Sequence, residues 1–239
     1  HALCLNTTGT ENVAVGALAL DANTTAGCNV GVGHGALSDN TTGAKNIAVG
    51  RNALGSNTTA DDNTAIGHSS LVLNTTGAEN TAVGYKSLDA NTTGAGHTAV
   101  GVNALGVNTT GNSNTAVGGA SLDANTTGGC NTAMGAGSLG ANTEGHSNAA
   151  FGYEALDEMT TGDCNVGVGR NTGGTTTTGD NNHSFGYNAQ PSSATVSHEI
   201  TLGNGSNNNL RCADTSISSL SDLRDKENIE DIPHGLDYI

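Results

Sequence analysis

The chain has few of the residues that build an ordinary globular core. Only 3% of its 239 residues are aromatic, Trp is absent and Pro occurs twice. A core built on Phe, Leu and Ile is therefore excluded. Disorder is disfavoured as well, because disordered chains are usually charged and rich in Pro, whereas charged residues make up 12% of this chain.

Basic residues and long apolar runs are also scarce. Seven Lys and Arg stand against 22 Asp and Glu, which gives a formal net charge of −15. This balance argues against nucleic acid as a partner, because phosphate binding needs Lys and Arg. No apolar run approaches the roughly 18–20 residues needed to span a bilayer, and we expect no secretory signal peptide within this sequence. We expect no membrane segment.

What is abundant is a repeat with a step of 17 residues. A glycine ends a short T-A-V-G-like motif at every step, and Leu follows four residues after each of the first nine glycines. An invariant step this short predicts a solenoid with one coil per repeat. The twelve glycines are Gly16, Gly33, Gly50, Gly67, Gly84, Gly101, Gly118, Gly135, Gly152, Gly169, Gly186 and Gly203.

The coil is predicted to be β rather than α. Seventeen residues are too few for two packed helices, and Gly, Asn and Thr recur at fixed places. We expect one strand at x-T-A-V-G, a second around x-A-L, and a turn at N-T-T-G, where Asn and Gly suit left-handed backbone. The fold class is therefore an all-β parallel β-solenoid, or β-roll, of twelve 17-residue coils.

One coil has a thin core, so part of its apolar surface needs cover. In one copy Ala82 and Gly84 form the expected inward set, and Val83 with Leu88 a second, larger one. Since long apolar faces are not left bare, we expect several identical chains packed side by side, in a homotrimer. The residue after each glycine varies, as a solvent-facing position does.

Three segments follow from the pattern. Residues 1–203 form the solenoid shaft, degenerate from about residue 170, where Gly173 replaces Leu. Residues 204–218 form a transition, and a helical domain begins within 219–239, where charge density rises and Leu220, Leu223, Ile229 and Ile232 recur at loose helical spacing.

The last segment carries a specific motif, S-D-L-R-D-K-E-N-I followed by G-L-D. It resembles the opening of the intramolecular chaperone domain of endosialidase-type phage tailspikes and fibres, which trimerises the fibre and then cuts itself off. The resemblance implies that Ser221 attacks the peptide bond between Leu220 and Ser221, with Lys226 as the base. The coil pattern is also similar to the β-roll heads of trimeric autotransporter adhesins.

Two interpretations of Ser221 stay open. A Ser–Lys dyad needs a neutral Lys, so burial or a nearby cation such as Arg224 would have to lower its pKa from about 10.4. Otherwise Ser219 caps a helix and Asp222 completes a capping box, without any chemistry. Near-identical coils can pair one step out of register, so an assembly domain at one end has a physical purpose either way.

Other patterns give weaker signals. Cys28, Cys130 and Cys164 occupy one repeat position, lie too far apart to bridge within a chain, and are expected to be free, buried thiols. The N-T-T copies read either as glycosylation sequons or, as we favour, as hydrogen-bonded turn ladders. The His residues are scattered, so no metal site and no cofactor are expected.

The sequence thus favours the structural shaft of a virus or phage fibre on the virion surface, used in host attachment. Expected partners are copies of the chain itself and a host-surface glycan or receptor. Any enzymology is a single-turnover self-cleavage. The alternatives are a cell-surface adhesin or extracellular filament subunit and, as a minor one, an ice-binding solenoid, since regular Thr arrays can match ice.

Overall fold

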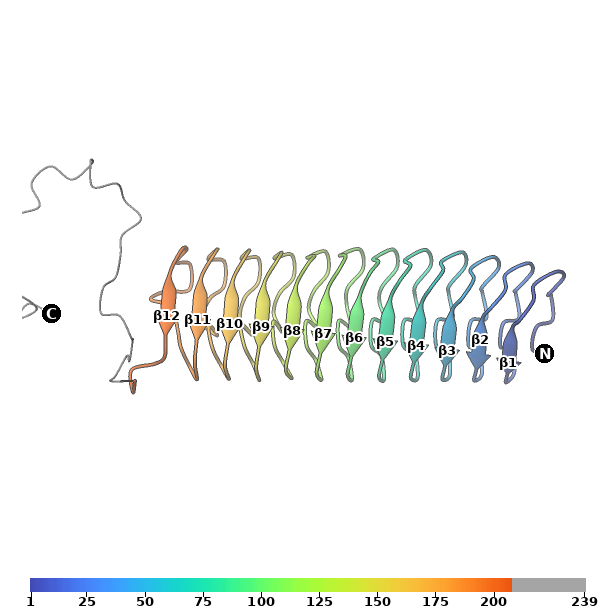
Figure 1. Ribbon diagram of the computed structural model, residues 1–239, viewed down its shortest axis with the longest axis horizontal. Coiled ribbons are helices and arrows are strands. Elements are labelled where there is room, and N and C mark those ends of the chain that lie inside the picture. Colours follow the sequence, from blue (N-terminus) through green and yellow to red (C-terminus); the bar gives the residue numbers. More distant parts are fainter. Residues whose placement is uncertain (208–239) are drawn as a thin grey trace, which may run out of the picture. The chain divides into compact units, whose positions relative to one another are not determined.

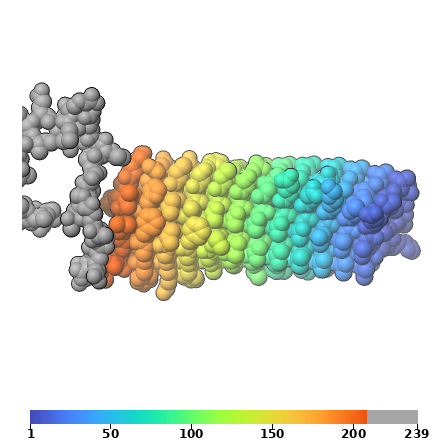
Figure 2. Space-filling model, in the orientation of Figure 1, coloured from blue at the N-terminus to red at the C-terminus, as the bar shows by residue number. Residues whose placement is uncertain are grey.

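A computed structural model describes residues 1–207, and residues His1–Ser206 form one compact unit. This unit is a solenoid of stacked coils, with one three-residue strand per coil (Figures 1 and 2). The twelve strands form a single parallel sheet in chain order. They are β1 Val13–Val15, β2 Val30–Val32, β3 Ile47–Val49, β4 Thr64–Ile66, β5 Thr81–Val83, β6 Thr98–Val100, β7 Thr115–Val117, β8 Thr132–Met134, β9 Ala149–Phe151, β10 Val166–Val168, β11 His183–Phe185 and β12 Ile200–Leu202.

The coils stack in strict register. Each strand residue pairs with the residue 17 positions later, as Ala82 pairs with Ala99. The glycine after each strand ends it: Gly84 has φ +140°, and a Cβ there would collide with the carbonyl of Gly101 in the next coil. Only glycine combines this φ with so close an approach. The predicted parallel solenoid of 17-residue coils is confirmed.

The predicted second strand is wrong. The x-A-L segment is a turn, and its leucines adopt left-handed φ angles, +52° at Leu88. This backbone costs about 1–2 kcal/mol in a residue with a Cβ, but it turns the side chain into the coil. There burial of a Leu contributes about 1.5–3 kcal/mol, and Leu88 is fully buried.

The core is therefore a row of leucines stacked beside a row of small residues. The central residue of each strand points inward, and Ala82 is fully buried like Leu88. The Leu20 side chain lies 3.4 Å from where a Cβ on Gly31 would stand, so these two rows pack directly on each other. Val83 does not share a surface with Leu88, as the sequence suggested; Leu88 is interior and Val83 is not.

Polar residues fill the rest of the interior. From Asn23 onward the asparagine of each N-T-T is buried, and its amide joins its own coil to the preceding one, whereas Asn6 at the end of the stack is half-buried. Asn91 Nδ2 donates to Asn74 Oδ1 and to the Gly94 carbonyl, both at 2.9 Å, and Asn91 Oδ1 accepts from Asn108 Nδ2. We call this row the turn asparagine ladder; its buried members are Asn23, Asn40, Asn57, Asn74, Asn91, Asn108, Asn125 and Asn142.

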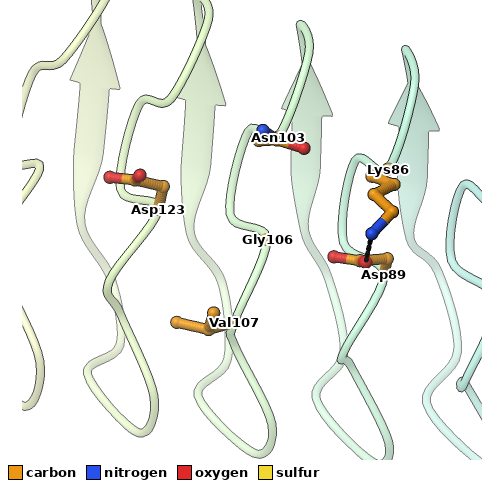
Figure 3. A pocket seen from close by; sticks show the side chains of 6 residues that line it. All are labelled: Lys86, Asp89, Asn103, Gly106, Val107 and Asp123. Atoms are coloured by element: carbon orange, nitrogen blue, oxygen red, sulfur yellow. Dashed lines mark ion pairs between the residues drawn. The ribbon is translucent and has the colours of Figure 1, made fainter.

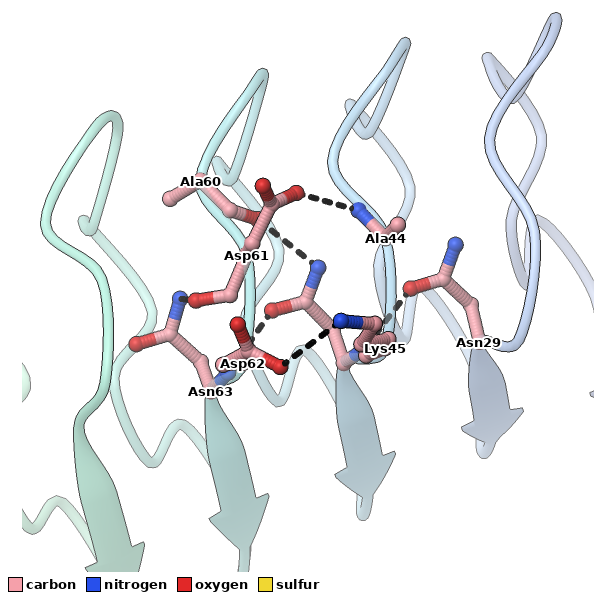
Figure 4. A network of polar contacts seen from close by, with 8 residues as sticks. Asn29, Ala44, Lys45, Ala60, Asp61, Asp62 and Asn63 are labelled. Atoms are coloured by element: carbon pink, nitrogen blue, oxygen red, sulfur yellow. Dashed lines mark hydrogen bonds and ion pairs between the residues drawn. The ribbon is translucent and has the colours of Figure 1, made fainter.

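A second row stands just before the strands. Asn63 accepts the Asn80 backbone N–H at Oδ1 (3.0 Å) and donates through Nδ2 to the Gly77 carbonyl (3.0 Å). Figure 4 shows this strand-entry asparagine ladder near Asn29 and Asn63, beside the ion pair of Lys45 with Asp62 (3.9 Å). Buried amides that are fully hydrogen-bonded avoid the penalty of desolvation and fix the stacking of the coils.

The turn asparagine ladder ends where the repeat begins to decay. Met159 occupies the same repeat position in the coil after Asn142 and its side chain has no N–H to donate, so Asn142 Oδ1 is buried without a hydrogen-bond partner. Two coils beyond, β11 and β12 still pair in register. The shaft therefore continues through the degenerate coils on backbone hydrogen bonds and on the strand-entry ladder, in which Asn182 Oδ1 accepts the Glu199 N–H (3.0 Å).

Asn91→Ala is expected to destabilise the solenoid by about 2–4 kcal/mol, because Asn74 Oδ1 loses its donor and Asn108 Nδ2 loses an acceptor. Thr93→Ala changes an exposed residue of the same turn and is expected to be nearly neutral. Denaturant midpoints of both variants check this. Similar losses in the two variants would mean that the ladder does not order the stack.

Candidate functional site

The predicted catalytic pair, Ser221 and Lys226, and the cut after Leu220 lie outside the described residues. The predicted transition at 204–218 lies outside them beyond residue 207, and the predicted helical domain at 219–239 lies wholly outside them. The self-cleavage site therefore stays a prediction. The surface of the solenoid itself offers two candidate sites, a strand face and a groove.

The strand face is formed by the first and third residues of every strand. None of these residues is buried, and none is Asp, Glu, Lys or Arg, although the chain has 22 acidic residues. The third positions, which we call the outer strand ladder, are apolar in all twelve coils. They are Val15, Val32, Val49, Ile66, Val83, Val100, Val117, Met134, Phe151, Val168, Phe185 and Leu202.

The exposure of this ladder is substantial along its length. Val15 is 57% exposed, Met134 43% and Leu202 57%. Contiguous apolar surface of this kind marks an interaction site in soluble proteins. The sequence singled out an apolar face needing cover, but assigned Leu88 to it; only the strand residues belong there, because the left-handed turn takes the leucines inside.

The groove lies on the turn side of the coils, between Lys86 and Asp123 (Figure 3). It has a volume of about 200 Å³ and is open to solvent. The Lys86 ammonium lies 3.8 Å from the Asp89 carboxylate and 5.9 Å from the centre of the Tyr85 ring. Its lining residues are Lys86, Asp89, Asn103, Gly106, Val107 and Asp123.

The two carboxyl groups of the groove are partly desolvated. Burial raises the pKa of Asp89, against the opposing effect of Lys86, and burial also raises the pKa of Asp123. Asp123 forms no ion pair with any residue of the described part. Both carboxylates thus lie at the surface of the groove as hydrogen-bond acceptors, and both have oxygen lone pairs left for further donors.

The position after each glycine is exposed, as predicted. Here Arg170 lies between two aromatic rings, 5.5 Å from the centre of Tyr153 and 5.8 Å from that of Tyr187. Tyr153 and Tyr187 are 49% and 60% exposed. Cation–π contacts at exposed sites contribute about 0.5–1 kcal/mol each. The two contacts therefore stabilise the stacking of these three side chains modestly, while both rings stay accessible to solvent.

Several polar signals in the sequence are resolved by burial. From Asn23 onward the N-T-T asparagines are inside the coil and their amides are used in the ladder, so the turn-ladder interpretation is confirmed and burial blocks sugar attachment to them in the folded chain. The first Thr of each turn extends the same pattern, since Thr75 Oγ1 donates to the Thr92 carbonyl (3.0 Å). The second Thr stays exposed, as Thr76 and Thr93 do.

The cysteine prediction is half wrong. Cys28, Cys130 and Cys164 are free, as expected, but all three are exposed rather than buried. Their repeat position has a left-handed φ, +62° at Cys28, which turns the side chain outward. The Cys28 thiol donates to Glu11 Oε2 (3.3 Å), and this hydrogen bond raises the pKa of Cys28.

His97 replaces asparagine in the strand-entry ladder, which sequence reasoning missed. The backbone N–H of His97 donates to Asn80 Oδ1 (3.0 Å), as the asparagines of this ladder do to their neighbours. The ring nitrogen Nδ1 accepts the backbone N–H of Asn114 (3.2 Å). The ring is 1% exposed, and burial lowers the pKa of His97 to about 4. The repeat alignment alone would have found it, as a His in a column that is Asn in every other coil except the last, where Glu199 stands.

Residues 1–207 hold no group of three or more His, Cys, Asp or Glu side chains placed to bind a metal ion. The same residues include no helix of the length and apolarity required to cross a membrane. No protein-family model, no curated protein and no solved structure matches the chain. Function is therefore argued from the strand face and the groove.

The stability of the solenoid is expected to fall with acidification through His97. The unfolded histidine titrates near 6.5 and the folded one near 4, so the unfolded chain binds the extra proton between these values. The contribution is complete above about pH 6.5 and declines as the pH falls toward 4, by about 3 kcal/mol in total.

The measurement is the unfolding free energy of the chain and of His97→Asn, the residue of the neighbouring coils, at about pH 7 and about pH 4. The variant should lose less stability than the parent on acidification. Equal losses would show that His97 does not titrate in this window.

Proposed function

We propose that the chain is the structural shaft of a virus or phage fibre that attaches the particle to its host. In this proposal three copies pack side by side through their strand faces. The shaft carries no turnover chemistry; it holds a contacting surface at a distance. Its place is the virion surface or another extracellular setting.

The observation that carries the proposal is the outer strand ladder. Twelve apolar side chains stand in one row, with no charged residue in either column of the face. If this face were solvent-exposed in the assembled protein, some of the chain's many acidic residues would be expected to occur on it. A second surface of the same kind is the simplest cover, because a copy of this chain has the same flat row at the same spacing.

Stacking of near-identical coils also creates an assembly problem. A neighbouring chain slipped by one coil would meet almost the same residues, so register has to be set at one end. The motif at residues 221–229 resembles a trimerising chaperone, which would provide that start. Self-cleavage between Leu220 and Ser221, with Lys226 as base, would then make assembly hard to reverse.

Two other functions stay as candidates. A cell-surface adhesin or an extracellular filament subunit would use the same face and the same assembly domain. An ice-binding solenoid is favoured by the exposed second Thr of the turns, such as Thr76 and Thr93, and by the Thr that begins each strand from β4 to β8, such as Thr98. The first Thr of each turn uses its hydroxyl inside the stack, and the other two Thr columns belong to different sides of the coil, so they do not form one array.

Charges placed on the strand face are expected to prevent association. The double variant Val83→Glu and Val100→Glu should be monomeric at concentrations where the parent is trimeric, because two desolvated carboxylates would face the interface. The matched control is Thr76→Glu and Thr93→Glu, in the same two coils. Their repeat position already carries Glu144 in another coil.

Sedimentation or native mass spectrometry of the two double variants checks the role of the face. The control should remain trimeric. A parent that is monomeric would overturn the fibre proposal, and a trimeric strand-face variant would place the interface elsewhere.

Self-cleavage is tested by the intact mass of the complete gene product beside Ser221→Ala. Wild-type chains should end at Leu220 while the variant stays whole, and both should be trimeric. If both stay uncut and trimeric, Ser221 is a helix-start residue and the C-terminal domain is a retained assembly cap.

A further inference from the structure

The turn side of the coils carries an alternation that stacking does not require. From Asp89 onward the residue after each core leucine position alternates between Asp and Gly for six coils. The series is Asp89, Gly106, Asp123, Gly140, Asp157 and Gly174. Gly106 and Gly140 each leave a gap between two carboxylates, whereas Gly174 lies between Asp157 and Pro191, and the groove of Figure 3 is the gap at Gly106.

Backbone geometry does not explain the glycine at 106. Its φ is not left-handed, and a Cβ there would meet its nearest neighbours at 3.3 and 3.5 Å, which small shifts accommodate. The same repeat position holds Ser38 and Val72 in earlier coils. Separation of like charges would be served equally by either of those neutral residues, so what glycine adds at this position is open space.

The lining of the groove suits a ligand rich in hydroxyl groups. Asp89 and Asp123 offer carboxylate oxygens that accept hydrogen bonds, Asn103 offers an amide that both donates and accepts, and Lys86 donates. Val107 gives an apolar patch beside them, and the Tyr85 ring stands at the Lys86 end. A few polar groups around an apolar surface are typical of small-molecule sites.

Charge selects among such ligands. The groove has two carboxylates and one ammonium, on a chain with a formal net charge of −15. An acidic ligand would be repelled, whereas sugar hydroxyl groups donate to carboxylates without bringing charge. We propose that the groove at Gly106 is a binding site for neutral glycans, repeated at Gly140, where Asp123 and Asp157 flank the gap.

The position of the groove is compatible with assembly through the strand face. In Figure 3 the strands pass behind the turns that carry the groove residues. The buried Ala82 and Leu88 belong to the strand and to the groove-side turn respectively. Chains packed through their strands would thus leave the groove open. The inference gives a ligand class to the proposed attachment role and rests on it for its biological meaning, while the binding itself is tested separately.

The test uses the full chain in its native assembly and three neutral hexasaccharides, maltohexaose, laminarihexaose and mannohexaose, by titration calorimetry. At least one should bind. The gap-filling pair Gly106→Val and Gly140→Val, which introduces the residue found at position 72, should weaken binding about tenfold or more by removing the open space. Asp123→Asn, which flanks both gaps, should weaken it as well.

The matched control is Gly55→Val. Gly55 occupies the same repeat position, and a Cβ there would have its nearest neighbour at 3.4 Å, but Ser38 and Val72 flank it instead of carboxylates. Affinity of this variant should stay within about twofold of the parent. Denaturant midpoints and oligomeric state of all variants should match the parent, so that lost binding reports the groove.

Several results would overturn the inference. Binding of none of the three sugars, or unchanged binding by the gap-filled chain, would reject a glycan site. Binding of hexalysine by the groove without binding of sugar would identify a basic peptide as the ligand, and binding of Ca²⁺ alone would identify a cation site. A trimer that binds no sugar would reject this inference and leave the shaft proposal standing, whereas a monomer would reject the shaft.

Discussion

The structure depends on strict vertical stacking of buried amides. Each asparagine of the two ladders satisfies its hydrogen-bonding groups partly in its own coil and partly in an adjacent one, as Asn91 does with Gly94 and Asn74. An unpaired buried amide costs about 1–3 kcal/mol, so a coil cannot shift without orphaning several groups. This constraint replaces the large apolar core that the composition lacks, and the orphaned Asn142 Oδ1 beside Met159 shows what one missing donor leaves behind.

The asparagine ladders and the leucines fill the interior and complete its hydrogen bonds, so the outward-facing positions are free to vary. The residues at these positions differ between the strand face and the turn side. The strand face excludes charge and keeps apolar residues in its outer ladder. The turn side carries carboxylates, lysine, tyrosine and glycine gaps. One side suits burial against an uncharged surface, and the other suits a polar ligand. This division supports a shaft that associates along one face and contacts its target along another.

Much of the fold could be predicted from the sequence, because an invariant step of 17 residues fixes the register of every strand. The glycines ending the strands were also predictable, since a positive φ and close approach restrict that position to glycine. The left-handed backbone predicted for the N-T-T-G turn was wrong, because Asn74 and Gly77 have no positive φ and the asparagine serves through its buried amide. The second strand and the buried cysteines were wrong for one reason. A left-handed residue reverses which way a side chain points, and at Leu88 and Cys28 nothing in the local residue type announces that conformation.

The sequence by itself determined that the chain is a parallel β-solenoid, how many coils it has and where they degenerate, since these follow from the period. The tertiary structure alone decided which apolar residues are interior, that the N-T-T amides from Asn23 onward are buried, and that His97 is a buried member of an asparagine ladder. It also decided that the turn at Gly106 lines a groove. Whether a side chain is buried or exposed depends on how the coils fold and stack. The 17-residue period of the sequence does not by itself show which repeat positions face the interior.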